Sequence, residues 1–203
     1  MTMNRERWAS LFNDTHNPPW HMDWRHVQMI HAVLCHELPA SVVEIGTYRG
    51  ASTSAIVEAM EAHPQINRAM LVDYAFQIPE WVTATVKNRV EMFEGDSALA
   101  YGYAADCWII DGNHEMQPAC QDLRSALHGG AKIIIVHDTR TAAAIGVGGH
   151  DGSAFIAEEL EGWCSCFTDD LKRDGELTHR GLLIAFVGMK PKPETLAALE
   201  SMQ

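Results

Sequence analysis

The chain has 203 residues, 47% of them hydrophobic, which suits one domain with a sizeable core. Acidic residues outnumber basic ones 27 to 15, and the resulting net charge of -12 disfavours nucleic-acid substrates and anionic membrane surfaces. No apolar run is long enough to cross a membrane, and the start, MTMNRERWAS, lacks the apolar core of a secretory signal. We therefore expect a cytoplasmic protein. Its five scattered cysteines include no CxxC pair, which indicates reduced thiols.

Residues 1–40 are expected to form a helical extension, because Trp24, Val27, Ile30 and Leu34 recur at helical spacing. Ahead of this helix stands NPPW, which resembles the motif with which amino-methyltransferases hold a target nitrogen. No strand leads into these four residues, so we interpret them as a rigid lead-in to the helix. Trp20 and Trp24 are candidates to cover a cofactor or a partner subunit.

Histidines recur at every fifth position in the same region. Five residues turn a helix by about 500°, so successive imidazoles cannot share a face. A solvated or partly packed set is therefore predicted in place of a metal site. The five are His16, His21, His26, His31 and His36.

Short apolar runs alternate with amphipathic segments along residues 41–190. Fully apolar strands that alternate with helices predict a parallel sheet covered on both faces, with ligands at the carboxyl ends of its strands. The last two strands, with no crossover helix between them, are expected to form an antiparallel hairpin. A short tail helix is expected over 191–203. The predicted strands are 41–46, 68–74, 89–96, 106–112, 129–139, 164–168 and 180–188, and the predicted helices are 52–63, one near 79–86, one after 112, and 156–163.

Acidic residues and glycines mark three successive strand ends. Gly46 and Gly50 bracket the first turn in a GxxxG spacing, which is not the GxGxxG of dinucleotide sites. Glu44 is placed to receive an ammonium group, Asp73 to accept hydrogen bonds from ribose hydroxyls, and Asp96 to lie near a base. This arrangement suits a cationic, ribose-bearing cofactor that has no phosphate.

With these residues the sequence resembles the class I S-adenosylmethionine-dependent methyltransferases, and among them the macrocin O-methyltransferase and cephalosporin-hydroxylase-like group. The matching stretches, within 41–188, are VVEIGTYRGAST, VDYAF, EGDSA, WIIDGNHEMQPACQDLRSAL, GGAKIIIVHDT and GLLIAFV. The resemblance implies a doubly wound, seven-stranded α/β fold of the Rossmann-like methyltransferase type, with S-adenosylmethionine as cofactor. The cofactor-binding residues that it implies are Glu44, Gly46, Tyr48, Gly50, Ser52, Asp73, Asp96, Ser97 and Asp111.

The fourth and fifth predicted strands end in polar clusters that should face the transferred methyl group. Asp111, His137 and Asp138 can converge on one divalent ion, Mg²⁺ or Mn²⁺, provided that the strand ends before Asp138. Members of the resembled group that bind metal commonly carry two acids where this chain has His137 and Asp138, and some have an acidic base where it has Asn113. His114 is then the nearest candidate base, beside Asp111 and Asp138 as catalytic residues. The alternative is that His137 packs and no metal binds.

The resulting hypothesis is O-methylation of a small hydroxylated acceptor, such as a sugar, polyketide or phenolic compound, by a homodimer. Two alternatives are a catalytically silent cofactor-binding protein and a nucleotide- or nucleic-acid-modifying enzyme of the same fold. The glycine-rich stretch 142–155 is interpreted as a lid or a plain loop. His179 is the weakest candidate and is better explained as a surface histidine.

Overall fold

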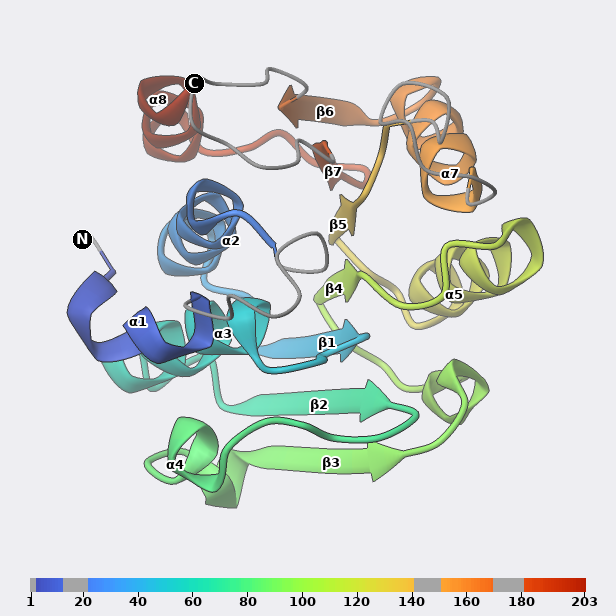
Figure 1. The fold of residues 1–203 in the computed structure, drawn as a ribbon. Coiled ribbons are helices and arrows are strands. Elements are labelled where there is room, and N and C mark those ends of the chain that lie inside the picture. The colour runs from blue at the N-terminus through green and yellow to red at the C-terminus, as the bar shows by residue number, and fades with distance from the viewer. Residues whose placement is uncertain (1–2, 13–21, 141–150, 170–180) are drawn as a thin grey trace.

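The computed structural model describes residues 3–12, 22–140, 151–169 and 181–203. At its centre lies a seven-stranded sheet in the order β3-β2-β1-β4-β5-β7-β6 (Figure 1). The first five strands are parallel, while β7 runs antiparallel to both β5 and β6. The predicted terminal hairpin is therefore confirmed, with β7 inserted between β5 and β6. The strands are β1 Ser41–Ile45, β2 Arg68–Asp73, β3 Val90–Glu94, β4 Cys107–Ile110, β5 Ile133–His137, β6 Ser165–Asp169 and β7 Leu182–Phe186.

Helices cover both faces of the sheet, as the apolar strands predicted. One hydrophobic cluster joins one face to α1, α2, α3 and α8, and a second joins the opposite face to α5 and α7. Alternate residues of each strand supply the two clusters, because successive side chains point to opposite sides. The helices are α1 Arg5–Phe12, α2 Trp24–Glu37, α3 Ala51–Ala62, α4 Glu80–Thr83, α5 Met116–His128, α7 Gly152–Glu161 and α8 Pro193–Met202, with 3₁₀ turns at Lys87–Arg89 and Ser97–Ala100.

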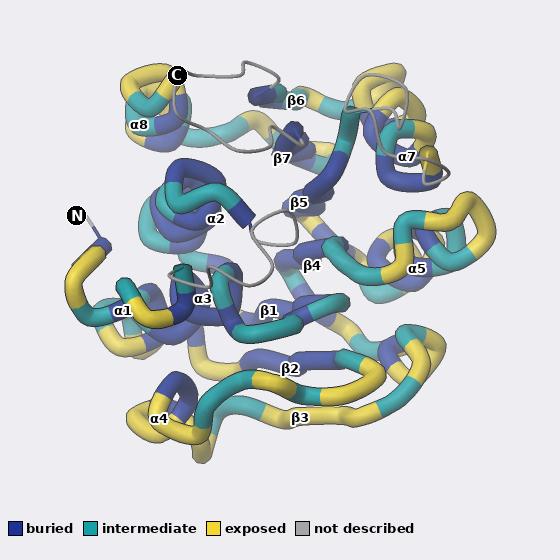
Figure 2. Tube along the Cα trace, in the orientation of Figure 1, coloured by how far each residue is buried: buried dark blue, intermediate teal, exposed yellow. Residues whose placement is uncertain are grey.

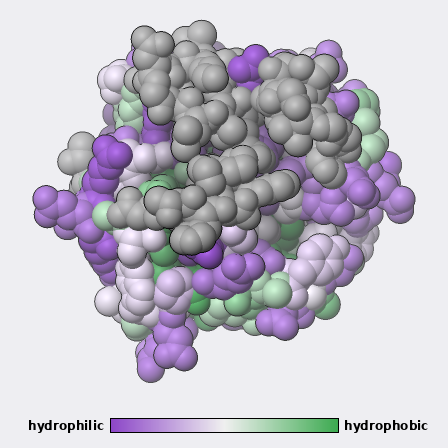
Figure 3. Space-filling view, in the orientation of Figure 1, coloured by the Kyte–Doolittle hydropathy of each residue, from purple (hydrophilic) through white to green (hydrophobic). Residues whose placement is uncertain are grey.

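The central strands are buried along their whole length, whereas the edge strand β3 is mostly exposed (Figure 2). Burial on both faces explains why β4, β5 and β7 are almost entirely apolar. Hydrophilic residues prevail around the rim of the view in Figure 3, in keeping with the net charge of -12. No helix of the described residues is long and apolar enough to cross a membrane.

The N-terminal helices pack on the same side of the sheet as α3. The predicted helix begins at Trp24, and the ring of Trp24 packs edge-on against Phe12, so it does not line the main cavity described below. NPPW and Trp20 lie outside the described residues. The division into an extension, residues 1–40, a methyltransferase domain, 41–190, and a tail, 191–203, stays a prediction.

The prediction of a solvated or partly packed histidine set is wrong for two of its members. His26 and His31 on α2 are 0% and 1% exposed. His26 contacts Asp169 of β6, a distant partner that the local spacing does not reveal, and His31 contacts Cys35 one turn further along the same helix. His16 and His21 lie outside the described residues.

Candidate functional site

A cavity of about 440 Å³ opens where β1, β2, β4 and β5 end. Strand order reverses between β1 and β4, and ligands of doubly wound sheets bind at such a switch point, outside the carboxyl ends of the strands. The volume lies within the range of small-molecule sites. Of the sequence-predicted site residues, those that line the cavity are Gly46, Tyr48, Asp73, Ser97, Asp111, His114, His137 and Asp138.

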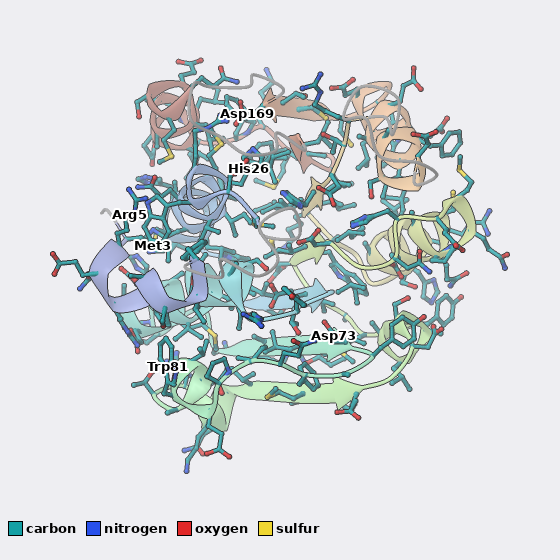
Figure 4. The ribbon with its side chains drawn as sticks, viewed as in Figure 1. Met3, Arg5, His26, Asp73, Trp81 and Asp169 are labelled. Atoms are coloured by element: carbon teal, nitrogen blue, oxygen red, sulfur yellow. The ribbon has the colours of Figure 1, made fainter. Side chains whose placement is uncertain are left out.

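The loop after β1 is held in shape by Asp73, at the end of β2 (Figure 4). Its Oδ2 accepts hydrogen bonds from the backbone N–H groups of Thr47 and Tyr48, both at 2.8 Å, and from the Thr47 hydroxyl at 3.1 Å. Tyr48 has a φ of 44°, a left-handed backbone conformation that glycine adopts more easily than other residues. Asp73 therefore shapes the cavity wall and also presents a carboxylate to it.

Gly46 lets two strand ends approach closely. Its φ is 81°, and a Cβ atom there would lie 2.1 Å from the carbonyl oxygen of Asp111. The backbone N–H of Asp111 donates to the carbonyl of Ile45 at 2.9 Å, so β1 and β4 stay paired up to the cavity. Any side chain at position 46 would push these strand ends apart.

Glu44 does not line the cavity, contrary to the position expected for a ligand of the cofactor's ammonium group. On β1 it shares a face with Val42 and points toward α3, where it is 0% exposed and accepts a 2.7 Å hydrogen bond from Thr53. Ser52 is buried beside it. Burial raises the pKa of Glu44 to about 8, although the hydroxyls of Ser52 and Thr53 oppose the shift.

We expect the Glu44→Gln variant to become more stable relative to the wild type as pH rises. With its folded pKa raised from 4.5 to about 8, Glu44 contributes stability that is full below pH 4.5 and is lost as pH rises through 8. Glutamine does not titrate, so the difference should shift toward the variant by at least about 1 kcal/mol between pH 5 and 8. Urea unfolding at both pH values measures it. Equal shifts in Glu44→Gln and in the exposed control Glu159→Gln would contradict this account.

The other predicted cofactor residues form the far wall of the cavity or lie behind it. Asp96 is exposed and caps the 3₁₀ turn that follows β3, since its Oδ1 accepts from the backbone N–H of Ala98 at 2.8 Å and its Oδ2 from the Tyr74 hydroxyl at 3.1 Å. Ser97 beside it lines the cavity, whereas Asp96 does not. Gly50 caps α3 with a φ of 90° and stands outside the lining.

Asp111, His137 and Asp138 meet at the opposite end of the cavity. Strand β5 ends at His137, and Asp138 turns aside with a φ of 57°, so both side chains face the same space. The Nδ1 atom of His137 lies 3.0 Å from Oδ1 of Asp111 and 3.3 Å from Oδ1 of Asp138. Convergence of Asp111, His137 and Asp138 requires the strand to end before Asp138, and β5 does end there.

His114 enters the same cluster from the loop after β4. Its Nε2 lies 3.0 Å from Oδ2 of Asp138 and 4.0 Å from Oδ1 of Asp111. On the other side of the ring, Nδ1 lies 2.9 Å from the Oγ of Ser153, in the first turn of α7. The backbone of α7 is close as well, because the N–H of Gly152 donates to the His114 carbonyl at 2.9 Å. A contact across 39 residues thus fixes the imidazole.

Ligand atoms of Asp111, His114 and Asp138 lie within 4.8 Å of one another, which is a suitable spacing for one metal ion. Mg²⁺ prefers oxygen ligands, whereas Mn²⁺ also accepts an imidazole nitrogen. Two carboxylates and one imidazole therefore suit Mn²⁺ better than Mg²⁺, but can bind either ion. This group contains two of the three ligands predicted from the sequence, with His114 in place of His137. Asn113 accepts a 3.0 Å hydrogen bond from the backbone N–H of Glu115 and so shapes the loop.

The cavity lining contains seven residues that were not predicted as site residues: Met22, Ile45, Val72, Tyr74, Gly95, Gly112 and Asn113. Tyr74 and Gly95 stand next to the predicted Asp73 and Asp96, so the strand-end pattern could have found them. Met22 carries no comparable signal. The predicted lid, 142–155, lies outside the described residues up to position 150, and Gly152 to Phe155 begin α7 instead of forming a loop.

The charge of the lining favours a cationic ligand. Asp73, Asp111 and Asp138 all face the cavity, and its described lining contains no lysine or arginine. A phosphate would meet carboxylates there without a basic partner, whereas a sulfonium or ammonium group would be attracted. The residues present therefore fit S-adenosylmethionine and not a dinucleotide.

Comparison with known proteins points the same way. A family described as a methyltransferase domain matches residues 43–139. Solved structures with the same fold include O-methyltransferase TomG from Streptomyces achromogenes, involved in tomaymycin synthesis and in complex with S-adenosylmethionine, with a TM-score of 0.69, 16% identity, and 92% of each chain covered. An O-methyltransferase from Bacillus cereus in complex with S-adenosylhomocysteine has a TM-score of 0.68 at 17% identity, covering 90% of this chain and 89% of the other. No curated protein matches the sequence.

The family match covers the predicted cofactor loop, the predicted ribose-binding acid Asp73 and the cluster from Asp111 to Asp138. None of these matches bears on the narrower macrocin and cephalosporin-hydroxylase-like group, which stays a prediction. Residues 43–139 therefore resemble a methyltransferase domain, and the chain shares its fold with solved O-methyltransferase structures.

Proposed function

We propose that the protein transfers the methyl group of S-adenosylmethionine to a hydroxyl oxygen of a small acceptor. The observation that carries this proposal is the acidic cavity with a carboxylate–imidazole cluster at one end. A hydroxyl must lose its proton as it is methylated, and this cluster offers groups that can take it. Several structural neighbours are described as O-methyltransferases, which supports oxygen as the acceptor atom.

The cofactor is proposed to lie along the wall formed by the ends of β1, β2 and β3. Asp73 would accept hydrogen bonds from the ribose hydroxyls, and Ser97 would stand at the adenine end, with Asp96 supporting it. Gly46, Tyr48 and Asp111 would hold the amino-acid end. Glu44, Gly50 and Ser52 would act from behind the wall, by shaping the loop and helix that carry it.

His114 is the proposed general base. Ser153 holds its Nδ1, which leaves Nε2 directed at Asp138 inside the cavity. The neighbouring carboxylate stabilises the imidazolium that forms when His114 accepts the acceptor's proton. Asp111 and Asp138 would hold Mg²⁺ or Mn²⁺, and an ion that engages the Asp138 carboxylate would leave the Nε2 of His114 free to take the proton. Such an ion, when bound, lowers the pKa of a hydroxyl and fixes its position.

Three finer points belong to the same proposal. The acceptor class is a hydroxylated sugar, polyketide or phenolic compound, because the protein is acidic and the described residues that line the cavity include no lysine or arginine to bind a nucleic acid. We further propose a homodimer and a cytoplasmic location.

A methyl-transfer assay tests the proposal. Labelled S-adenosylmethionine is incubated with the protein and a panel of hydroxylated sugars, polyketides and phenols, before and after treatment with a chelator. The proposal predicts label in at least one product as an O-methyl group, with turnover that falls on chelation and returns with Mg²⁺ or Mn²⁺. Transfer to nitrogen or carbon acceptors alone would contradict it, and turnover that chelation leaves unchanged would remove the metal from the proposal and leave His114 as the base.

A further inference from the structure

A buried polar cluster lies directly behind the candidate reaction centre. It consists of Arg25 and His26 on α2, Asp169 at the end of β6, and His137 at the end of β5, which are 8%, 0%, 0% and 3% exposed. Buried charged and polar groups are costly to keep in a core. The methyl-transfer chemistry proposed above makes no use of Arg25, His26 or Asp169, so their presence calls for another explanation.

The first contact of the cluster joins α2 to β6 (Figure 4). The Arg25 guanidinium forms a buried ion pair with Asp169, and Nε2 of His26 lies 3.2 Å from Oδ2 of the same carboxylate. Burial alone would raise the pKa of Asp169, but its contacts with His26 and Arg25 hold it below the ordinary value. Asp169 is thus an ionised anchor for the His26 ring.

The second contact joins His26 to the site. Its ring lies 5.3 Å from the ring of His137, centroid to centroid, at an angle of 77°. The sheet places the partners side by side, because Asp169 and His137 are both paired with Leu182 of the strand between them. Because Asp169 anchors the His26 ring, and this ring lies across the His137 ring, His26 limits how far the His137 ring can rotate.

The orientation of His137 matters for the carboxylates of the site. Its Nδ1 faces Oδ1 of Asp111 at 3.0 Å and Oδ1 of Asp138 at 3.3 Å. Carboxylate oxygens only accept hydrogen bonds, so the hydrogen must be on Nδ1. A rotated His137 would turn this donor away and leave two carboxylates without the group that holds them together. Such supporting hydrogen bonds orient the ligands of metal and proton-transfer sites.

We propose that His26 and Asp169 are positioning residues for the reaction centre: anchored by Arg25, they fix the His137 ring so that its Nδ1–H bridges Asp111 and Asp138. The importance of this arrangement for turnover rests on the proposed function, but the orientation of His137 does not. The geometry of His137 can therefore be tested even in a protein that shows no methyl transfer.

The test compares His26→Ala with His31→Ala. His31 is a matched control, because it lies on the same helix, is 1% exposed, and has a pKa that burial lowers to about 4, as for His26, yet it contacts Cys35 instead of the site. The readouts are the ¹⁵N signals of the His137 imidazole in metal-free protein, the Mn²⁺ dissociation constant, and kcat separately from KM. The variant His26→Phe keeps a planar ring against His137. Asp169→Asn removes the charge that anchors the His26 ring, and it serves as the perturbing variant if His26→Ala does not fold.

In the wild type we expect one His137 tautomer, with the proton on Nδ1. His26→Ala should mix the tautomers and weaken Mn²⁺ binding, with kcat reduced by about 10–100-fold and KM nearly unchanged, as for other residues that support metal ligands. His26→Phe should restore most of the tautomer signal, and His31→Ala should change none of the readouts. The proposal is overturned if His26→Ala, or Asp169→Asn where His26→Ala does not fold, leaves the His137 signals as in the wild type, or if His31→Ala alters them equally. Failure of the wild type to transfer methyl groups would count against the proposed function alone, since the tautomer comparison would still decide this one.

Discussion

The substitution His114→Gln is expected to lower kcat by about 10²–10⁴-fold while S-adenosylhomocysteine binds nearly as well as to the wild type. His114 presents Nε2 to the carboxylates of Asp111 and Asp138, and glutamine has no basic nitrogen with which to replace it. Because the cofactor would lie along the opposite wall, its binding should survive. The two measurements are the steady-state rate of methyl transfer and a calorimetric titration with S-adenosylhomocysteine.

A control on the neighbouring helix separates chemistry from folding. His128 ends α5, the helix that follows His114, and stacks on the exposed Tyr101 away from the main cavity. His128→Gln should therefore retain wild-type kcat. Ser153→Ala, which removes the hydroxyl beside Nδ1, should give an intermediate loss of roughly tenfold. A His114→Gln protein with undiminished kcat would show that another group takes the proton.

Gly46→Ala is expected to destabilise the protein by several kcal/mol and to weaken cofactor binding at least about tenfold. The left-handed backbone at φ 81° costs a non-glycine residue about 1–2 kcal/mol, and overlap of the new Cβ with the Asp111 carbonyl adds roughly 1–3 kcal/mol. Relief of that overlap requires β1 and β4 to separate at the point where the cofactor's amino-acid end would lie. Urea unfolding and titration with S-adenosylhomocysteine measure the two effects.

Gly102→Ala is the matched control for this prediction. Gly102 has a φ of 80°, almost the same as Gly46, but a Cβ there meets no atom within 4 Å. The Gly102→Ala variant should lose only the stability that a left-handed backbone costs a non-glycine residue, and it should bind the cofactor as the wild type does. Equal loss of stability in the two variants would mean that the close approach of Gly46 to Asp111 contributes nothing, and the account of the loop would be wrong.

The fold could be predicted because its signals are local and repeated. The parallel strands, apart from the exposed edge strand β3, are short and mainly apolar, and each strand end is marked by a glycine or an acid, as in Ile45-Gly46 and Val72-Asp73. Once the strands are parallel, their carboxyl ends share one edge of the sheet, so the convergence of Asp111 with His137 and Asp138 follows from topology. No exact side-chain geometry was needed for these predictions.

What the sequence did not reveal depends on contacts between distant segments or on which face a side chain takes. The 39-residue contact of His114 with Ser153 and the burial of His26 against Asp169 have no local signature. Strand alternation showed that Glu44 and Ile45 point to opposite faces, but not that the face of Glu44 is the one covered by α3. His137 was predicted as a ligand because of its neighbour Asp138, and the structure places it as the partner of two carboxylates.

The central claim is that the acidic cavity at the ends of β1, β2, β4 and β5 binds S-adenosylmethionine beside a cation site, and calorimetric titration tests it most directly. The purified protein is titrated with S-adenosylhomocysteine, without and with Mn²⁺, and Asp111→Ala is treated in the same way. The account predicts micromolar binding of the cofactor product by the wild type and a Mn²⁺ signal that disappears in Asp111→Ala. No heat of binding from the wild type with S-adenosylhomocysteine, with or without Mn²⁺, would contradict it.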